Sequence, residues 1–193
     1  MGRAFVVNEV GSSWDVLRTE SLCVTPWLVV NRETVATPSR PGGVEWTTVV
    51  RPTATVIAPR TAEGNYLLIR QERIPVRREM WEFPAGQVDG NAEVEATARR
   101  ELGEEAGVSC PGPLVPLGLF FPSCGFTNEC CHLFLATDIE PAPNLTAHGA
   151  LEAIHEVREF SPDELCEAIR AGVVSDANTL ATFARLQARG LFR

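Results

Sequence analysis

The chain has 193 residues, which is enough for one well-buried core with at most a small additional unit. Hydrophobic residues make up 45% and charged residues 22%, a composition that excludes wholesale disorder. The formal net charge of -8 argues against binding to nucleic acid or to an anionic membrane. No apolar run approaches the roughly 18 residues of a transmembrane helix, and the N-terminus does not resemble a secretory signal, so we expect a cytoplasmic protein. The six cysteines form no CxxC pair, which predicts reduced, mostly buried thiols rather than a cysteine zinc site or disulfides.

The first fifty residues predict a small antiparallel β unit. Residues 22–30 form a dense apolar segment, residues 38–43 (Pro-Ser-Arg-Pro-Gly-Gly) form a turn, and residues 44–50 resume a β-branched, extended pattern. We therefore expect an N-terminal β subdomain over residues 1–50 and a second domain over residues 51–193.

The second domain alternates strands with a few helices. The predicted strands are residues 53–58, 66–70, 115–121, 132–136 and 157–160. A helix is predicted over residues 92–106, because apolar residues recur there at a spacing of four and Gly107 follows as a stop. Two further helices are expected, one beginning at the capping sequence Ser161-Pro162-Asp163-Glu164 and one over residues 176–188. This order predicts a mixed α/β sandwich.

Three carboxylates share one face of the first of these helices. Glu101, Glu104 and Glu105 stand at positions i, i+3 and i+4, which brings their side chains close together. Like charges at this spacing destabilise a helix by a few tenths of a kcal/mol per pair, and a hard divalent cation such as Mg²⁺ would compensate. The alternative is a solvated acidic face, and the three residues alone leave both interpretations open.

The neighbouring residues resemble the signature of the Nudix hydrolases. That signature is a glycine, five residues, a glutamate, seven residues and then R-E-U-x-E-E-x-G-U, where U is aliphatic. Residues 100–108 (RELGEEAGV) match its second half in full, and Gly86 stands at the expected distance. Ala92 departs from it, because the family has a glutamate there that braces Arg100; Glu93 or Asp89 could substitute.

Other segments resemble one group within this family, the ADP-ribose pyrophosphatases and related nucleotide-sugar hydrolases. The similar segments are residues 67–73 (LLIRQER), 81–86 (WEFPAG) and 122–129 (PSCGFTNE). Cys124 replaces the proline that this group usually has. Pro26-Trp27 and the β unit around it also fit the group, whose N-terminal subdomain mediates dimerisation, so the resemblance implies a homodimer.

The resemblance implies a metal site and a catalytic set. Glu101 and Glu105 would be the main ligands of Mg²⁺, or alternatively Mn²⁺, with Glu104 and the backbone carbonyl of Ala85 assisting. The catalytic set would contain Glu105, Arg100 and a general base. The family often takes that base from a loop that corresponds to residues 139–153, where Glu152 is preferred over Glu140.

The substrate contacts are also implied by the resemblance. Arg73 would bind the diphosphate, with a surface salt bridge as the alternative. Glu82 would touch the substrate or brace Arg100, and Glu129 would add a further contact. Trp27 would stack on a base, or else pack in the core or at the dimer interface.

The expected fold is a Nudix-type α/β/α sandwich with a mixed sheet, preceded by the small antiparallel β subdomain. The expected activity is Mg²⁺-dependent hydrolysis of the pyrophosphate bond of ADP-ribose or a related nucleoside diphosphate sugar, giving a nucleoside monophosphate and a sugar phosphate. Two alternatives remain open: a dinucleoside polyphosphate or nucleoside triphosphate hydrolase, and a non-catalytic nucleotide-sugar-binding protein of the same fold. The expected partner is a small nucleoside diphosphate, without nucleic acid or membrane.

Overall fold

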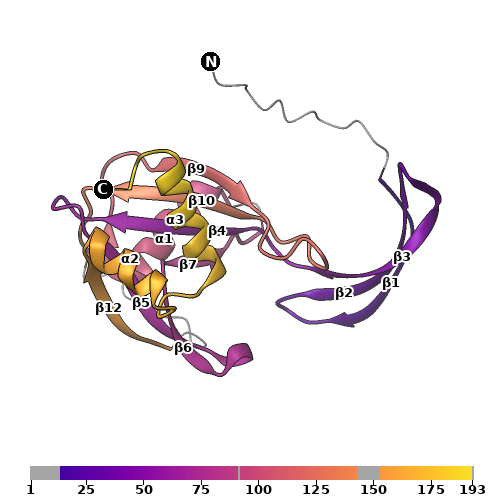
Figure 1. Ribbon diagram of the computed structural model, residues 1–193. Helices are drawn as coiled ribbons and strands as arrows, with labels where there is room; N and C mark the ends of the chain where they lie inside the picture. The colour runs from indigo at the N-terminus through magenta and orange to yellow at the C-terminus, as the bar shows by residue number, and fades with distance from the viewer. Residues whose placement is uncertain (1–13, 91, 143–152, 193) are drawn as a thin grey trace, which may run out of the picture. The chain divides into compact units, whose positions relative to one another are not determined.

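The computed structural model describes residues 14–90, 92–142 and 153–192 (Figure 1). The chain divides into two compact units. One is the described part of Met1–Arg51 together with Ser123–Asn128, and the other is Pro52–Pro122 with Glu129–Arg193. Within the part of the chain that the structure describes, no helix has the length and apolarity needed to cross a membrane.

The first unit is a three-stranded antiparallel sheet, as predicted. Its strands are β1 (Asp15–Val24), β2 (Val29–Thr37) and β3 (Arg40–Val50), in the order β1-β2-β3. Strand β3 begins at Arg40, inside the predicted turn, because β2 and β3 pair closely enough to leave only Pro38 and Ser39 between them.

A segment from much later in the sequence completes this unit. The amide of Val49 donates to the carbonyl of Phe126 at 2.7 Å, and the indole Nε1 of Trp46 donates to the carbonyl of Gly125 at 2.9 Å. These bonds attach Ser123–Asn128 to strand β3, so the division of the chain is not the single boundary after residue 50 that the sequence suggests.

The second unit is built on a mixed seven-stranded sheet. Its main path is β12 (Ile154–Phe160), β5 (Tyr66–Arg73), β4 (Ala54–Arg60), β10 (Cys131–Thr137) and β9 (Val115–Phe120); β6 (Arg78–Glu82) pairs with β5, and β7 (Ala85–Gln87) pairs with β4. Strands β4 and β10 are parallel and the other pairs are antiparallel. The short strands β8 (Val108–Ser109) and β11 (Glu140–Pro141) pair separately, and a 3₁₀ turn, η1 (Ile74–Val76), joins β5 to β6.

Helices cover both faces of this sheet, which confirms the predicted sandwich. One buried cluster joins the sheet to Leu165 of α2 (Pro162–Arg170) and Leu186 of α3 (Ala177–Ala188). A separate cluster contains Ala98 and Leu102 of α1 (Val94–Ala106). In the view of Figure 1, α2 and α3 cross in front of the sheet and α1 lies behind it.

The predicted helix ends agree with the local chemistry. Helix α1 begins at Val94, two residues later than predicted, and ends at Ala106; the next residue, Gly107, has a φ of 65°, the left-handed geometry that glycine tolerates. Ser161 and Glu164 form the reciprocal capping box at the start of α2. Asp176 caps α3 by accepting from the amide of Thr179.

The cysteines are all free, as expected, but the prediction that they are mostly buried is wrong. Cys110 and Cys131 are buried, whereas Cys23 and Cys124 are exposed and the remaining two are half-buried. Both exposed thiols lie in the first unit, where residues 14–51 and 123–128 form a three-stranded sheet without a helix to cover it.

Candidate active site

The acidic face of α1 is turned inward. Glu101 is 5% exposed and Glu105 is 2% exposed, so two of the three clustered carboxylates are buried. The side chain of Glu104 is half-buried. A buried carboxylate is costly unless a cation or hydrogen-bond donors surround it. The burial of this pair therefore argues against the solvated acidic face that the sequence left open.

Arg100 supplies positive charge from the same helix. Its Nη2 lies 2.6 Å from Oε1 of Glu101, and its Nη1 donates to Glu104. Burial lowers the pKa of the Arg100 guanidinium, but the carboxylates of Glu101 and Glu104 raise it by more, so the pKa lies above its ordinary value. Arg100 thus bonds to two of the three clustered carboxylates.

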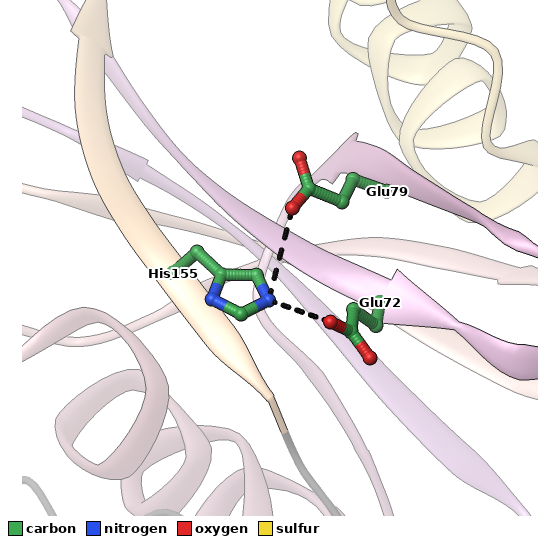
Figure 2. A group of neighbouring side chains, drawn as sticks. All are labelled: Glu72, Glu79 and His155. Carbon is green, nitrogen blue, oxygen red and sulfur yellow. Dashed lines mark hydrogen bonds and ion pairs between the residues drawn. The ribbon is translucent and has the colours of Figure 1, made fainter.

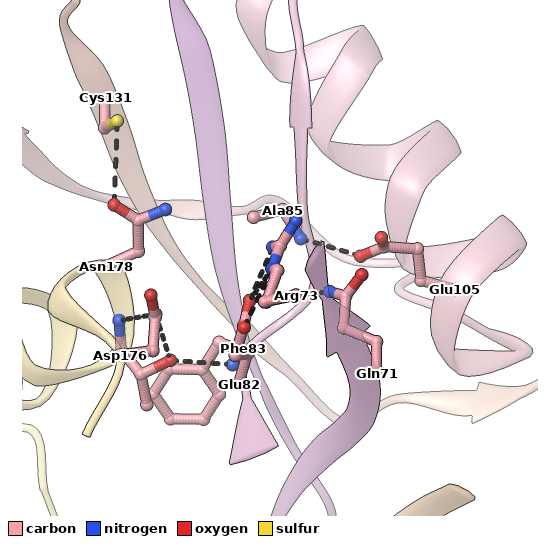
Figure 3. Close-up of polar contacts among 10 residues, drawn as sticks. Gln71, Arg73, Glu82, Phe83, Ala85, Glu105, Cys131, Asp176 and Asn178 are labelled. Carbon is pink, nitrogen blue, oxygen red and sulfur yellow. Dashed lines mark hydrogen bonds and ion pairs between the residues drawn. The ribbon is translucent and has the colours of Figure 1, made fainter. Parts of the chain in front are cut away.

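Strand β7 passes directly over the buried carboxylates. The amide of Ala85 donates to Oε2 of Glu105 at 2.7 Å (Figure 3). At Gly86, an added Cβ would lie only 1.9 Å from Oε1 of Glu101, so only glycine permits this approach. The carboxylate oxygens of Glu101 and Glu105 thus lie close beneath the strand, and carboxylate oxygens are ligands that suit a hard divalent cation such as Mg²⁺.

A second buried group lies just before this strand. Nε of Arg73 is 2.9 Å from Oε1 of Glu82, and Nη2 is 2.6 Å from Oε2, a two-point ion pair (Figure 3). Gln71 adds a bond of 3.4 Å to the same carboxylate. Burial raises the pKa of Glu82, which is 1% exposed, while Arg73 opposes that rise; the bond to Glu82 in turn raises the pKa of Arg73.

Helix α3 fixes the turn between these two groups, a contact that the sequence did not reveal. The amide of Phe83 donates to Oγ1 of Thr179 at 2.9 Å, and this hydroxyl donates to the capping carboxylate of Asp176 at 2.8 Å. Thr179 is fully buried. The sequence predicted a helix over residues 176–188, but nothing local connects Thr179 of this helix to Phe83, which lies 96 residues earlier.

The structure brings together the residues predicted for the metal site and the adjoining arginine. Glu101, Glu104, Glu105, Arg100 and the backbone of Ala85 lie together at the junction of α1 and β7.

The ion pairs bear on the structural alternatives for Glu82 and Arg73. Glu82 braces Arg73 and not Arg100, so this part of the expectation is corrected. Glu82 stands opposite Ile69 in the pairing of β6 with β5, and side chains alternate along a strand, so Arg73 projects from the same face of β5 and its long side chain reaches Glu82. The salt bridge weighed for Arg73 is present, although its partner is buried rather than on the surface. Glu93, one of the two residues considered as a substitute for the family's glutamate, is the N-cap residue of α1 and makes no capping bond with its side chain. Arg100 bonds to Glu101 and Glu104.

Three further residues were predicted for the site, namely Trp27, Glu129 and Glu152. Trp27 belongs to the first unit and is 58% exposed, so it is not a core residue of the chain. Glu129 is half-buried and precedes β10. Glu152 lies outside the described residues, and Glu140 is on the short strand β11, opposite Ser109. The roles of Trp27, Glu129 and Glu152 stay predictions.

Comparison with known proteins shows which family the chain resembles. The NUDIX domain pattern matches residues 50–183. The chain is 34% identical over 119 residues to an ADP-ribose pyrophosphatase of Bacillus subtilis, an alignment that covers 62% of this chain but only 57% of that protein. It is 30% identical over 137 residues to an ADP-ribose pyrophosphatase of Mycobacterium tuberculosis, covering 70% of this chain and 65% of that protein.

Two further similar proteins are described by other names. A methanol dehydrogenase activator of Bacillus methanolicus is 29% identical over 139 residues, with 72% of this chain and 74% of that protein covered. The crystal structure of an ADP compounds hydrolase superposes with a TM-score of 0.75 over 93% of this chain and 97% of that one. At 17% identity, this last similarity shows a shared fold.

Proposed function

Because the chain belongs to the NUDIX domain family, we propose that it hydrolyses the pyrophosphate bond of ADP-ribose or a related nucleoside diphosphate sugar. The products would be a nucleoside monophosphate and a sugar phosphate. The observation that carries the proposal is the burial of Glu101 and Glu105 beneath the close-passing strand at Gly86. The two relatives named ADP-ribose pyrophosphatase support the choice of substrate.

The proposed cofactor is Mg²⁺, with Mn²⁺ as the alternative. Glu101 and Glu105 would hold the ion, assisted by Glu104 and the carbonyl of Ala85. When bound, the cation would neutralise charge on the non-bridging phosphate oxygens. Arg100 positions two of these carboxylates through its bonds to Glu101 and Glu104.

Arg73 is the proposed diphosphate contact. Its side chain is 40% exposed, so it is accessible, and its bonds to Glu82 use Nε and Nη2. A guanidinium held in this way is already oriented, so less side-chain entropy is lost when it binds a phosphate. Trp27 and Glu129 are proposed as further substrate contacts.

Glu152 is the proposed general base. A carboxylate that ligates a cation is a poor proton acceptor, because the cation holds its oxygens, so the base should be a separate acid. Glu152 lies two residues before β12, which is paired with β5 in the central sheet. Glu140 is the second candidate.

A substrate panel tests the proposed activity. The full chain would be assayed with Mg²⁺ and with Mn²⁺ against ADP-ribose, other nucleoside diphosphate sugars, dinucleoside polyphosphates and nucleoside triphosphates. We expect the highest kcat/KM for ADP-ribose or another nucleoside diphosphate sugar, with a nucleoside monophosphate as product. A preference for triphosphates or dinucleoside polyphosphates would replace this proposal, and tight binding without turnover would favour the non-catalytic alternative.

We also propose that the protein is a homodimer that associates through the first unit. All ten residues of β1 are exposed in the single chain. The sheet and its turns expose large apolar side chains: Trp14, Val16, Leu17, Leu22, Val24, Trp27 and Trp46. So many large apolar side chains exposed on one small unit are costly in water and are typical of an interface.

Light scattering at micromolar concentration should therefore give the mass of a dimer. Val24 on β1 is 70% exposed in the single chain and is the residue chosen to disrupt the dimer. Val24→Asp should yield a monomer, because the aspartate carboxylate would be desolvated at the interface. Val173→Asp is the matched control, since Val173 is 54% exposed and lies in the second unit. A wild-type monomer, or equal dissociation of both variants, would contradict this interface.

A further inference from the structure

Three metal-ligating side chains meet on three neighbouring strands of the central sheet. Glu72 comes from β5, Glu79 from β6 and His155 from β12 (Figure 2). Glu72 and Glu79 are direct cross-strand partners. His155 lies at an irregularity in the pairing of β12 with β5, between Ile154 and Glu156. Bulges of this kind change the direction of a side chain, and here the imidazole is directed at the two carboxylates.

The donor atoms have the spacing of a small coordination site. Nε2 of His155 is 3.1 Å from Oε1 of Glu72 and 3.8 Å from Oε1 of Glu79, and the three ligand atoms all lie within 4.8 Å of one another. Tetrahedral Zn²⁺, with bonds of about 2.0–2.1 Å, separates its donors by about 3.3 Å. The two distances to Nε2 bracket that separation, so small side-chain movements would complete the geometry.

The charges around the cluster favour a cation between the carboxylates. Like charges directly opposite each other on paired strands are destabilising, and Glu72 and Glu79 are such a pair. Arg70 compensates part of the negative charge of Glu79, because its Nη1 is 3.5 Å from Oε2 of that carboxylate. The other oxygen of Glu79, Oε1, is the one that faces His155.

Arg70 is itself held in place. Its Nη2 is 3.3 Å from Glu156, and its guanidinium lies 5.7 Å from the centre of the Trp81 ring. Outer partners that orient a carboxylate in this way are typical of metal sites, because they fix which oxygen is presented to the ion.

The cluster is distinct from the acidic face of α1. Side chains alternate between the two faces of a strand, so Glu72 projects opposite to its neighbours Gln71 and Arg73. Those two residues bond to Glu82 in the group that adjoins Ala85 and Glu105. A ligand at Glu72, Glu79 and His155 would therefore occupy a separate site.

We propose that Glu72, Glu79 and His155 bind a divalent transition-metal ion, Zn²⁺, with water completing the coordination. An imidazole with two carboxylates suits Zn²⁺, whereas Mg²⁺ prefers ligands that are all oxygen. Because the three ligands come from β5, β6 and β12, the bound ion would cross-link these strands. Without metal, the same contacts join exposed polar side chains, and such contacts stabilise a protein little.

Calorimetric titration of the full chain with Zn²⁺, in millimolar Mg²⁺ to occupy the α1 site, tests this proposal. We expect one high-affinity Zn²⁺ per chain, weakened at least about tenfold in His155→Gln and in Glu72→Gln. His132→Gln is the matched control, since it also removes one imidazole but lies on β10. Zn²⁺ at saturating concentration should also raise the Tm of the wild type by about 5 °C, and not that of His155→Gln.

Two results would overturn the proposal: no Zn²⁺ binding by the wild type in the presence of Mg²⁺, or equal affinity in the wild type and His155→Gln. The exposed thiols of Cys23 and Cys124 also attract Zn²⁺, but their contribution would persist in His155→Gln and is therefore subtracted. These measurements do not use turnover, so their failure would leave the proposed hydrolase activity untouched.

Discussion

Replacing Glu105 by glutamine is expected to lower kcat by about three orders of magnitude or more while the protein stays folded. The glutamine has nearly the same shape, and its side-chain oxygen can still accept from the amide of Ala85, the bond that measures 2.7 Å in the wild type. Only the negative charge that would hold the cation is lost. The measurement is kcat for the best substrate of the panel in saturating Mg²⁺, alongside the Tm of each protein.

Glu95→Gln is the matched control for this substitution. Glu95 lies on the same helix but on its exposed side, where it pairs with Arg99, so its loss should leave kcat nearly unchanged. Activity of Glu105→Gln within a few-fold of the wild type would remove Glu105 from the ligand set.

Glu152→Gln separates ligation from proton transfer. If Glu152 is the base, its loss should lower kcat by about 10²–10⁴-fold without changing the affinity for Mg²⁺, whereas Glu105→Gln should weaken both. Glu140→Gln should have little effect. Near-normal turnover in Glu152→Gln would assign the base to another acid.

The second large effect concerns stability. Arg73→Met is expected to lower the free energy of unfolding at neutral pH by about 2 kcal/mol, because it leaves the buried carboxylate of Glu82 without its cation. The estimate is below the about 3–5 kcal/mol of fully buried pairs because the side chain of Arg73 is 40% exposed and partly screened by solvent. Urea unfolding followed by circular dichroism measures the change.

This deficit should depend on pH in a defined direction. Burial already raises the pKa of Glu82 above its ordinary value of 4.5, and Arg73 opposes the rise, so removing Arg73 raises the folded-state pKa further. A carboxyl group with a raised folded-state pKa stabilises the folded protein while it is protonated. This contribution to the free energy of unfolding is lost as the pH rises through the folded-state pKa. The deficit of Arg73→Met should therefore be small in acid and grow towards neutral pH.

The double variant Arg73→Met/Glu82→Gln is the control. It removes the unpaired charge together with its partner, so it should recover part of the lost stability and should not show the pH-dependent deficit. A single variant within about 0.5 kcal/mol of the wild type, or a deficit that does not change with pH, would contradict this account of the pair.

The sequence by itself determined the features that depend on neighbouring residues. The end of α1 at Gly107, the capping box at Ser161 and the cap at Asp176 follow from backbone groups only a few residues apart. The placement of three glutamates on one face of α1 has the same origin, since helical geometry fixes the spacing of side chains at i, i+3 and i+4. The alternation of strands and helices likewise sufficed for the sandwich.

Only the tertiary structure decided which distant residues meet. The bond from Ala85 to Glu105, the choice of Arg73 as the partner of Glu82 and the attachment of Ser123–Asn128 to β3 depend on strand register and on the docking of α1. So does the meeting of His155 with Glu72, which lies 83 residues earlier. Residue spacing does not encode such pairings, because they result from the burial of whole strands and helices, and a change of one residue in register would turn these side chains to the opposite face.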